Sequence, residues 1–244
     1  MMRKILWILY QPYKWIIFIP LALILTLFFG FFTVAVYYLS NPKIASYLGG
    51  VIWARTLCIL TPIRLRKVGK KYIQKKQSYV IIANHSSSFD ILVLYARLGV
   101  DFKWVMKQEL RKVPGLGVAC KKLGHIFVDR SSPKAALETI ENAKSSIKDG
   151  TCIVFFPEGT RTKAGGLADF KKGAFKMAFD LNLPLLPVSV KGTNKIHEPG
   201  TLNIFPGTAS LIFHPPILIS DYSWENVEDL MQHAKEVISS GLEN

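Results

Sequence analysis

Residues 79–90 read Tyr-Val-Ile-Ile-Ala-Asn-His-Ser-Ser-Ser-Phe-Asp, and this stretch decides the fold. Its first five residues are apolar and rich in β-branched side chains, which is typical of a strand buried on both faces. Small polar residues follow at once, and the serines can cap a helix that we expect over residues 91–98. A buried strand that runs through a short polar turn into a helix indicates an α/β sheet.

Strand and helix patterns alternate along the rest of the chain. Strand-like runs occur at residues 102–106, 126–128, 152–155, 185–190 and 209–213, and helical patterns occur at 133–148 and 173–181. Residues 221–242 are predicted to form a closing helix with its apolar side chains on one side. The predicted fold class is therefore α/β over residues 63–244, with a mostly parallel sheet flanked by helices.

The first 62 residues have a different character. Residues 15–39 contain no charged side chain, and a helix of this length can cross a hydrocarbon core of roughly 30 Å. Asn41 and Pro42 then suit the N-cap and the first position of a second apolar helix that ends near residue 60. The segment lacks the small-residue cleavage site of a signal peptide, so we expect residues 1–62 to be retained as a two-helix membrane anchor.

The two helices either dip into one leaflet or form a full hairpin, and both arrangements return the chain to its starting side. We favour them over a single span. The basic residues that precede the first helix would keep that side cytoplasmic.

The composition limits the partners of the chain. Lys and Arg outnumber Asp and Glu by 31 to 17, which gives a net charge of +14, and half of the residues are hydrophobic. Such a charge attracts polyanions, and the apolar N-terminus favours anionic membrane lipids over nucleic acid, for which we find no motif. The basic residues expected to reach the headgroups are Arg3, Lys4, Lys14, Lys43 and Arg55.

The three cysteines, Cys58, Cys120 and Cys152, show no Cys-x-x-Cys spacing. We therefore predict neither a metal site nor a disulfide framework, and a reducing cytoplasmic setting fits best.

His85 and Asp90 stand at the end of the first buried strand, and ligands bind at strand ends in open α/β sheets. An aspartate that accepts from one ring nitrogen fixes the tautomer of the histidine and makes the other nitrogen a better base. Alternatively, His85 is a structural histidine and Asp90 is favoured at a helix start by the helix dipole. This segment alone leaves both interpretations open.

Two further strand ends carry polar motifs. Residues 124–130 read Gly-His-Ile-Phe-Val-Asp-Arg, and residues 155–162 read Phe-Phe-Pro-Glu-Gly-Thr-Arg-Thr. Backbone N–H groups near a glycine and a guanidinium fork are suited to a phosphate. Alone, Asp129 and Arg130 are more typical of a surface turn than of a phosphate site, and residues 155–162 are equally compatible with a plain turn.

Taken together and in order, the motifs are far more specific. Asn-His-x4-Asp, Gly-x-Ile-Phe-x-Asp-Arg, Phe-Pro-Glu-Gly-Thr-Arg and a Leu-Pro-Val strand closely resemble the glycerolipid acyltransferase family, in particular the 1-acylglycerol-3-phosphate acyltransferases. The resemblance covers roughly residues 63–190. Val128 and Thr162 replace residues that are often Ile and Ser in the family, and neither change removes a required chemical group.

The resemblance implies transfer of a fatty acyl group from acyl-CoA or acyl-carrier protein to the sn-2 hydroxyl of lysophosphatidic acid, giving phosphatidic acid. It implies no cofactor. Because the helix pair returns the chain to its starting side, we expect the enzyme at the cytoplasmic face of the cell membrane. His85 would take the hydroxyl proton while Asp90 orients its ring. Because the chain has no Gly-x-Ser-x-Gly elbow, we favour direct transfer over an acyl-enzyme.

The acceptor is expected to bind through residues of the family motifs, namely Arg130, Glu158, Gly159, Thr160 and Arg161. Glu158 cannot favour a phosphate directly, so we expect it to hold Arg161 or Arg130, or to accept from a glycerol hydroxyl. Lys107, at the end of the strand after the histidine helix, either adds positive charge or is an ordinary solvated lysine.

Two alternatives stay open. One is an acyltransferase with another acceptor, such as glycerol 3-phosphate or a different lysophospholipid. The other is a non-catalytic protein that keeps the fold and binds anionic lipid, against which the intact His85 and Asp90 pair argues.

Overall fold

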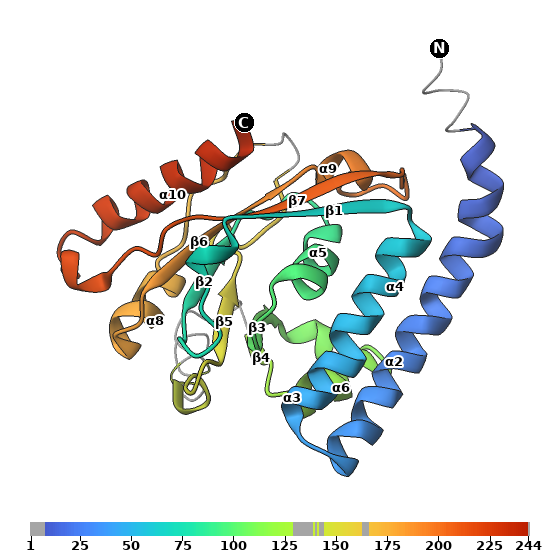
Figure 1. Ribbon diagram of the computed structural model, residues 1–244, viewed down its shortest axis with the longest axis horizontal. Coiled ribbons are helices and arrows are strands. Elements are labelled where there is room, and N and C mark those ends of the chain that lie inside the picture. The colour runs from blue at the N-terminus through green and yellow to red at the C-terminus, as the bar shows by residue number, and fades with distance from the viewer. Residues whose placement is uncertain (1–7, 129–138, 140, 142–143, 163–165, 244) are drawn as a thin grey trace.

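The computed structural model describes residues 8–128, 139, 141, 144–162 and 166–243, and its strands form one seven-stranded sheet. The sheet and the helices around it are drawn in Figure 1. The strands are β1 Ile63–Val68, β2 Val80–Ala83, β3 Phe102–Lys107, β4 Ile126–Val128, β5 Cys152–Phe155, β6 Leu185–Lys191 and β7 Gly207–Phe213. Their order is β1-β7-β6-β2-β5-β3-β4, and every neighbouring pair is parallel except β6 with β7. The predicted mostly parallel sheet is confirmed.

The sequence-based prediction misses β1, which pairs with β7 at one edge of the sheet. Its sequence is Ile-Arg-Leu-Arg-Lys-Val, in which buried or half-buried positions alternate with exposed ones. Basic residues interrupt its apolar residues, so β1 does not stand out as an apolar run. Charged side chains on an edge strand also discourage pairing with another chain.

Helices cover both faces of the sheet, as expected. The principal ones are α5 Phe89–Arg97, α8 Gly173–Leu181 and α10 Val227–Glu243, and the shorter ones are α6 Leu116–Lys122 and α9 Thr193–Ile196. Single 3₁₀ turns, η3 Lys70–Tyr72, η4 Gln108–Lys112, η5 Lys144–Ser146 and η6 Ile219–Asp221, lie between them. The helix predicted over residues 133–148 falls largely outside the described residues.

The closing helix begins later than predicted, at Val227 instead of residue 221. Residues 219–221 form the 3₁₀ turn η6, and the Asn226 side chain accepts a hydrogen bond from Ser223 N at 2.7 Å. This local side-chain bond competes with the helix and delays its start.

Alternate side chains of β2 build two separate parts of the core. Ile81 and Ala83 pack with α5 and with the second of the N-terminal helices. Val80 and Ile82 point to the other face and pack with α8 and α10. Because β2 is buried on both faces, packing fixes the position of its end and so restricts the residues that follow it.

Two long antiparallel helices precede the sheet (Figure 1). The first runs from Ile8 to Leu39 and includes a π-helical segment, η1 Tyr13–Phe18, and α2 Ile19–Leu39. The second consists of α3 Pro42–Ala45, a π-helical segment η2 Ser46–Val51 and α4 Ile52–Leu60. The predicted cap is confirmed, because Asn41 Oδ1 accepts from Ile44 N at 3.0 Å with proline at the first helical position.

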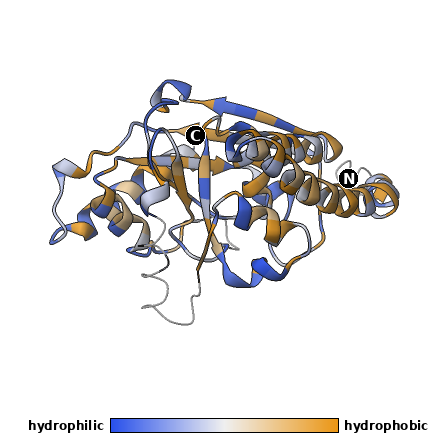
Figure 2. Cartoon of the chain, turned by 90° about the horizontal axis from the view of Figure 1, so that it is seen from below, coloured by the Kyte–Doolittle hydropathy of each residue, from blue (hydrophilic) through white to orange (hydrophobic). Residues whose placement is uncertain are grey.

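Both helices, Ile8–Leu39 and Pro42–Leu60, are long and apolar enough to cross a membrane. The first has many exposed apolar side chains, among them Ile16, Leu23 and Phe31, each more than 60% exposed. In Figure 2, which looks at the molecule from below, the helix pair carries mostly the hydrophobic colour.

The helix pair is fastened to the α/β domain at several points. Lys14 Nζ donates to Leu202 O at 3.2 Å, and Arg55 Nε donates to Ala96 O at 3.2 Å. The expectation that all five basic residues face one headgroup layer is therefore wrong: Lys14 is 2% exposed and binds a backbone carbonyl of the domain, and Lys43 lies at the turn, at the opposite end of the pair from Lys14. Arg55 is exposed, and its contact with headgroups stays a prediction. Arg3 and Lys4 lie outside the described residues.

Candidate functional site

The site begins where β2 ends. The Asn84 side chain bridges to β6, since its Nδ2 donates to Val190 O at 2.9 Å and its Oδ1 accepts from Val190 N at 2.7 Å. This bridge fixes the backbone just before His85. His85 Nδ1 lies 2.9 Å from Asp90 Oδ2, so the predicted proximity of the two side chains is confirmed.

Asp90 is fully buried, and its carboxylate is surrounded by donors. Oδ2 accepts from the backbone N–H groups of Ser86 at 2.7 Å and Ser87 at 2.8 Å, as well as facing His85 Nδ1. An ionised carboxylate can only accept. His85 therefore carries its proton on Nδ1, which leaves the lone pair of Nε2 as the basic position.

The His85 ring is held by stacking as well as by Asp90. Its centroid lies 3.9 Å from that of Phe156, and the two planes are 10° apart. Phe156 in turn stacks on Trp104 at 5.4 Å. The side chain of His85 remains 15% exposed, so its ring is oriented without being sealed from a substrate.

Glu158 supports the backbone of the site, a role that its sequence motif did not predict. Its Oε1 accepts from His85 N at 2.7 Å, and its Oε2 accepts from Ala168 N at 3.0 Å. The carboxylate is only 3% exposed, and burial raises its pKa. Both carboxylate oxygens thus hold backbone N–H groups, and each can accept a further donor. Arg130 lies outside the described residues, and contact of Glu158 with Arg161 or with a glycerol hydroxyl stays a prediction.

The same loop also holds the carbonyl of His85. Thr162 N donates to His85 O at 3.0 Å, and the Thr162 hydroxyl lies 3.3 Å from the same oxygen and 3.1 Å from Gly166 O, the two acceptors within reach of its one proton. Glu158 and Thr162 thus clamp the backbone of His85 from both sides. The threonine that departs from the family pattern keeps a hydroxyl at this point.

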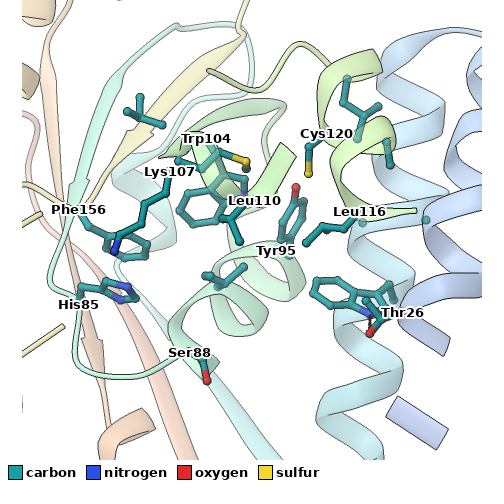
Figure 3. Close-up of a pocket in the computed structure, with 18 of the residues that line it drawn as sticks. Thr26, His85, Ser88, Tyr95, Trp104, Lys107, Leu110, Leu116, Cys120 and Phe156 are labelled. Atoms are coloured by element: carbon teal, nitrogen blue, oxygen red, sulfur yellow. Dashed lines mark hydrogen bonds between the residues drawn. The ribbon is translucent and has the colours of Figure 1, made fainter. Parts of the chain in front are cut away.

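His85 opens onto a cavity of about 610 Å³. Figure 3 shows His85, Phe156 and Lys107 at one end and Leu116, Cys120 and Thr26 at the other. Around His85 the walls also include Gly159, Thr160 and Arg161, and the far part of the cavity runs between α6 and the N-terminal helices. Its inner lining is mainly apolar, with residues such as Trp53, Ile91, Met106, Leu110, Leu116 and Leu123.

The predicted site residues therefore separate into three groups. Lys107, Gly159, Thr160 and Arg161 line the cavity together with His85. Asp90 and Glu158 lie behind His85, where they hold its ring and its backbone. Arg130 lies outside the described residues.

Another histidine near the cavity is not a second base. His125 Nδ1 accepts from Trp104 N at 3.1 Å, so its Nε2–H donates to the Tyr95 hydroxyl at 2.8 Å. Burial lowers the pKa of His125 to about 3. It is neutral at physiological pH and fixes Trp104 and Tyr95 in the cavity wall.

The buried cysteines offer no activated nucleophile. Cys120 lines the cavity and Cys152 lies in β5, and burial raises the pKa of each thiol to about 12. A nucleophilic cysteine requires a lowered pKa. Among the residues that the structure describes, no cluster of three or more His, Cys, Asp or Glu side chains could hold a metal ion.

Comparison with known proteins gives consistent results. A profile of the Acyltransferase family matches residues 64–191. The crystal structure of the 1-acyl-sn-glycerophosphate (LPA) acyltransferase PlsC from Thermotoga maritima superposes with a TM-score of 0.81. The two sequences are 28% identical, over 99% of this chain and 96% of that one.

Sequence relatives agree with the structural comparison. A 1-acyl-sn-glycerol-3-phosphate acyltransferase of Limnanthes douglasii is 30% identical over 80% of this chain and 67% of its own length. The chloroplastic 1-acyl-sn-glycerol-3-phosphate acyltransferase BAT2 of Brassica napus is 35% identical over 57% of this chain, but the match spans only 40% of that protein. The chain therefore belongs to the Acyltransferase family, which confirms the resemblance seen in its motifs.

Proposed function

We propose that this chain is a 1-acylglycerol-3-phosphate O-acyltransferase. It transfers a fatty acyl group from acyl-CoA or acyl-carrier protein to the sn-2 hydroxyl of lysophosphatidic acid, and the product is phosphatidic acid. One observation carries the proposal: the basic nitrogen of His85 lies at the mouth of an apolar cavity whose rim holds Lys107 and Arg161.

In this mechanism His85 Nε2 takes the proton of the sn-2 hydroxyl as that oxygen attacks the thioester carbonyl. The new C–O bond forms and the C–S bond breaks, and the imidazolium returns its proton to the departing thiolate. Asp90 stabilises the imidazolium through Nδ1. A general base typically contributes about 10²–10⁴-fold, so positioning must supply the remainder.

The cavity supports binding of an amphiphilic pair of substrates. Its apolar interior suits a fatty acyl chain, because burying hydrocarbon gains about 25 cal/mol for each Å² removed from water. Lys107 and Arg161 are exposed at the mouth, where positive charge suits a lysolipid phosphate. The Arg161 guanidinium can bind two phosphate oxygens at once.

Arg161→Ala is expected to raise the apparent KM for lysophosphatidic acid about tenfold or more while changing the KM for the acyl donor little. Arg161→Lys should rescue only partly, because an ammonium cannot reproduce the bidentate fork. Steady-state kinetics with each substrate varied in turn measures both constants. Arg66→Ala, an exposed arginine on β1, is the matched control. If only the donor KM rises, the assignment is reversed.

The proposed acceptor is tested directly with purified protein, labelled acyl-CoA and a panel of acceptors. Lysophosphatidic acid should be acylated faster than glycerol 3-phosphate or lysolipids with larger headgroups. A preference for glycerol 3-phosphate would support the first alternative. The assay is repeated with acyl-carrier protein as the donor. If neither donor releases thiol with any of the acceptors, the remaining alternative is the non-catalytic lipid-binding protein.

We further propose that residues 1–62 anchor the protein in the cell membrane with the catalytic domain on the cytoplasmic face. The exposed apolar surface of the helix pair supports this, as does the position of the cavity, whose far end runs between that pair and α6. A lysolipid could then reach His85 from the bilayer. The thioester donor would arrive from the cytoplasm.

Membrane association is expected to survive washing with 1 M salt. At this concentration the Debye length is roughly 3 Å, so attraction between exposed charges is screened, whereas the burial of apolar side chains in lipid is not weakened. Tags at Met1 and at Asn244 should both be accessible from the cytoplasmic side only. Protease protection in right-side-out and inverted vesicles measures this. Finding the two ends on opposite sides would replace the helix pair with a single span.

A further inference from the structure

The Asp90 carboxylate is held at both oxygens. While Oδ2 faces His85 and two backbone N–H groups, Oδ1 accepts a hydrogen bond from the hydroxyl of Thr193. Thr193 is 103 residues further along the chain and is fully buried. It opens the short helix α9, directly after β6.

A second hydroxyl lies behind the first. Ser86 Oγ is 3.2 Å from Thr193 Oγ1, and both side chains are buried. A threonine hydroxyl has one proton, and a carboxylate can only accept. Thr193 therefore donates to Asp90 and accepts from Ser86, so the two dipoles point the same way, toward the negative charge.

The turn before Thr193 is built for this placement. Gly192 has a φ of +89°, in the region that favours glycine. A Cβ on Gly192 would lie 2.4 Å from Thr208 O in β7. Glycine therefore lets the chain turn out of β6 close against β7 and bring the next residue, Thr193, to Asp90.

We infer that Thr193, with Ser86 behind it, is a positioning residue that locks the Asp90 carboxylate in the orientation in which Oδ2 serves His85. Without this donor, the buried carboxylate has an unsatisfied oxygen and can relieve it by rotating or by taking up a proton. Either change weakens its support of the imidazolium. Thr193 thus acts on how the pair of His85 and Asp90 is held, and the kinetic consequences of this role rest on the proposed function.

The test compares Thr193→Val with Thr193→Ser. Valine keeps the shape and removes the hydroxyl, so kcat should fall about tenfold to a hundredfold, as expected for one hydrogen bond to a charged group. Both KM values should stay within about twofold, and serine should restore most of the activity. Thr151→Val is the matched control, because Thr151 also donates to an aspartate, Asp101, outside the dyad.

Two further readouts separate positioning from a general structural role. In Thr193→Val the acid limb of the kcat–pH profile should move to lower pH, because an imidazolium with a weaker partner loses its proton more easily. In an Asp90→Asn background, Thr193→Val should change kcat less than about twofold, since its effect passes through Asp90. A full additive loss in that background, or an unchanged kcat and pH profile in the folded single variant, would overturn the inference.

A titration of His85 by ¹⁵N NMR tests the inference independently of catalysis. The pKa of His85 should be lower in Thr193→Val than in the parent protein and unchanged in Thr193→Ser. If the parent protein lacks acyltransferase activity but this shift is seen, the proposed function fails and the positioning role stands. If Thr193→Val does not fold, Ser86→Ala is titrated in its place, with a smaller shift in the same direction expected, and no shift overturns the inference.

Discussion

His85→Ala is expected to abolish acyl transfer and leave the protein folded. The imidazole is the group placed to take the acceptor proton, and general-base help of this kind contributes about 10²–10⁴-fold. The loss should therefore be at least about a hundredfold in kcat. The side chain is partly exposed, and the backbone clamps from Glu158 and Thr162 do not need the ring.

Thiol release with a saturating thioester donor and lysophosphatidic acid measures the effect, and circular dichroism on heating measures the fold. His233→Ala is the matched control, because His233 is exposed on α10 and bonds to the hydroxyl of nearby Tyr222. It should retain parental activity. Near-normal turnover by a folded His85→Ala protein contradicts the mechanism.

Asp90→Asn is expected to lower kcat by about 10²–10⁴-fold. The carboxylate accepts from four donors, namely the backbone N–H groups of Ser86 and Ser87, the ring of His85 and the hydroxyl of Thr193. An amide places an NH₂ group where one of the two oxygens stood, so donors face each other on that side. It also lacks the charge that stabilises the imidazolium.

The variant should also lose about 1–3 kcal/mol of stability, as expected when buried donors lose their acceptor. Single-turnover rates measure the catalytic loss, and chemical denaturation measures the free energy of unfolding. Asp101→Asn, which also loses an acceptor for a threonine hydroxyl, should lose stability but keep its rate. An Asp90→Asn rate within tenfold of the parent would mean that Asp90 is mainly structural.

Much of the fold could be predicted because its signals are local. The buried strands β2 and β5 are short apolar runs, and the paired N-terminal helices are long ones that meet at an Asn-Pro cap. His85 and Asp90 are close in sequence, so one tight turn brings them together. The edge strand β1 was not predicted, because basic residues interrupt its apolar residues.

The orientation of side chains in the site could not be predicted in the same way. Glu158 belongs to a recognisable motif, but its contact with His85 N depends on β5 lying next to β2 in the sheet. Thr193 lies in no motif that the sequence singled out. Thr193 is a hydroxyl residue just after the Leu-Pro-Val strand, and this is the only sign of it in the sequence. The sign becomes useful once β6 is known to lie next to β2, because the ends of the two strands then meet.

The central claim is that His85 drives direct transfer from thioester to lysolipid. The most direct measurement follows labelled acyl-CoA in a single turnover, with and without lysophosphatidic acid, and analyses protein, lipid and free thiol. The account predicts that label stays in acyl-CoA until lysophosphatidic acid is added. It then passes into phosphatidic acid with one thiol released for each molecule formed, and His85→Ala shows neither product. Label on the protein in the absence of acceptor, or phosphatidic acid formed by folded His85→Ala, would contradict it.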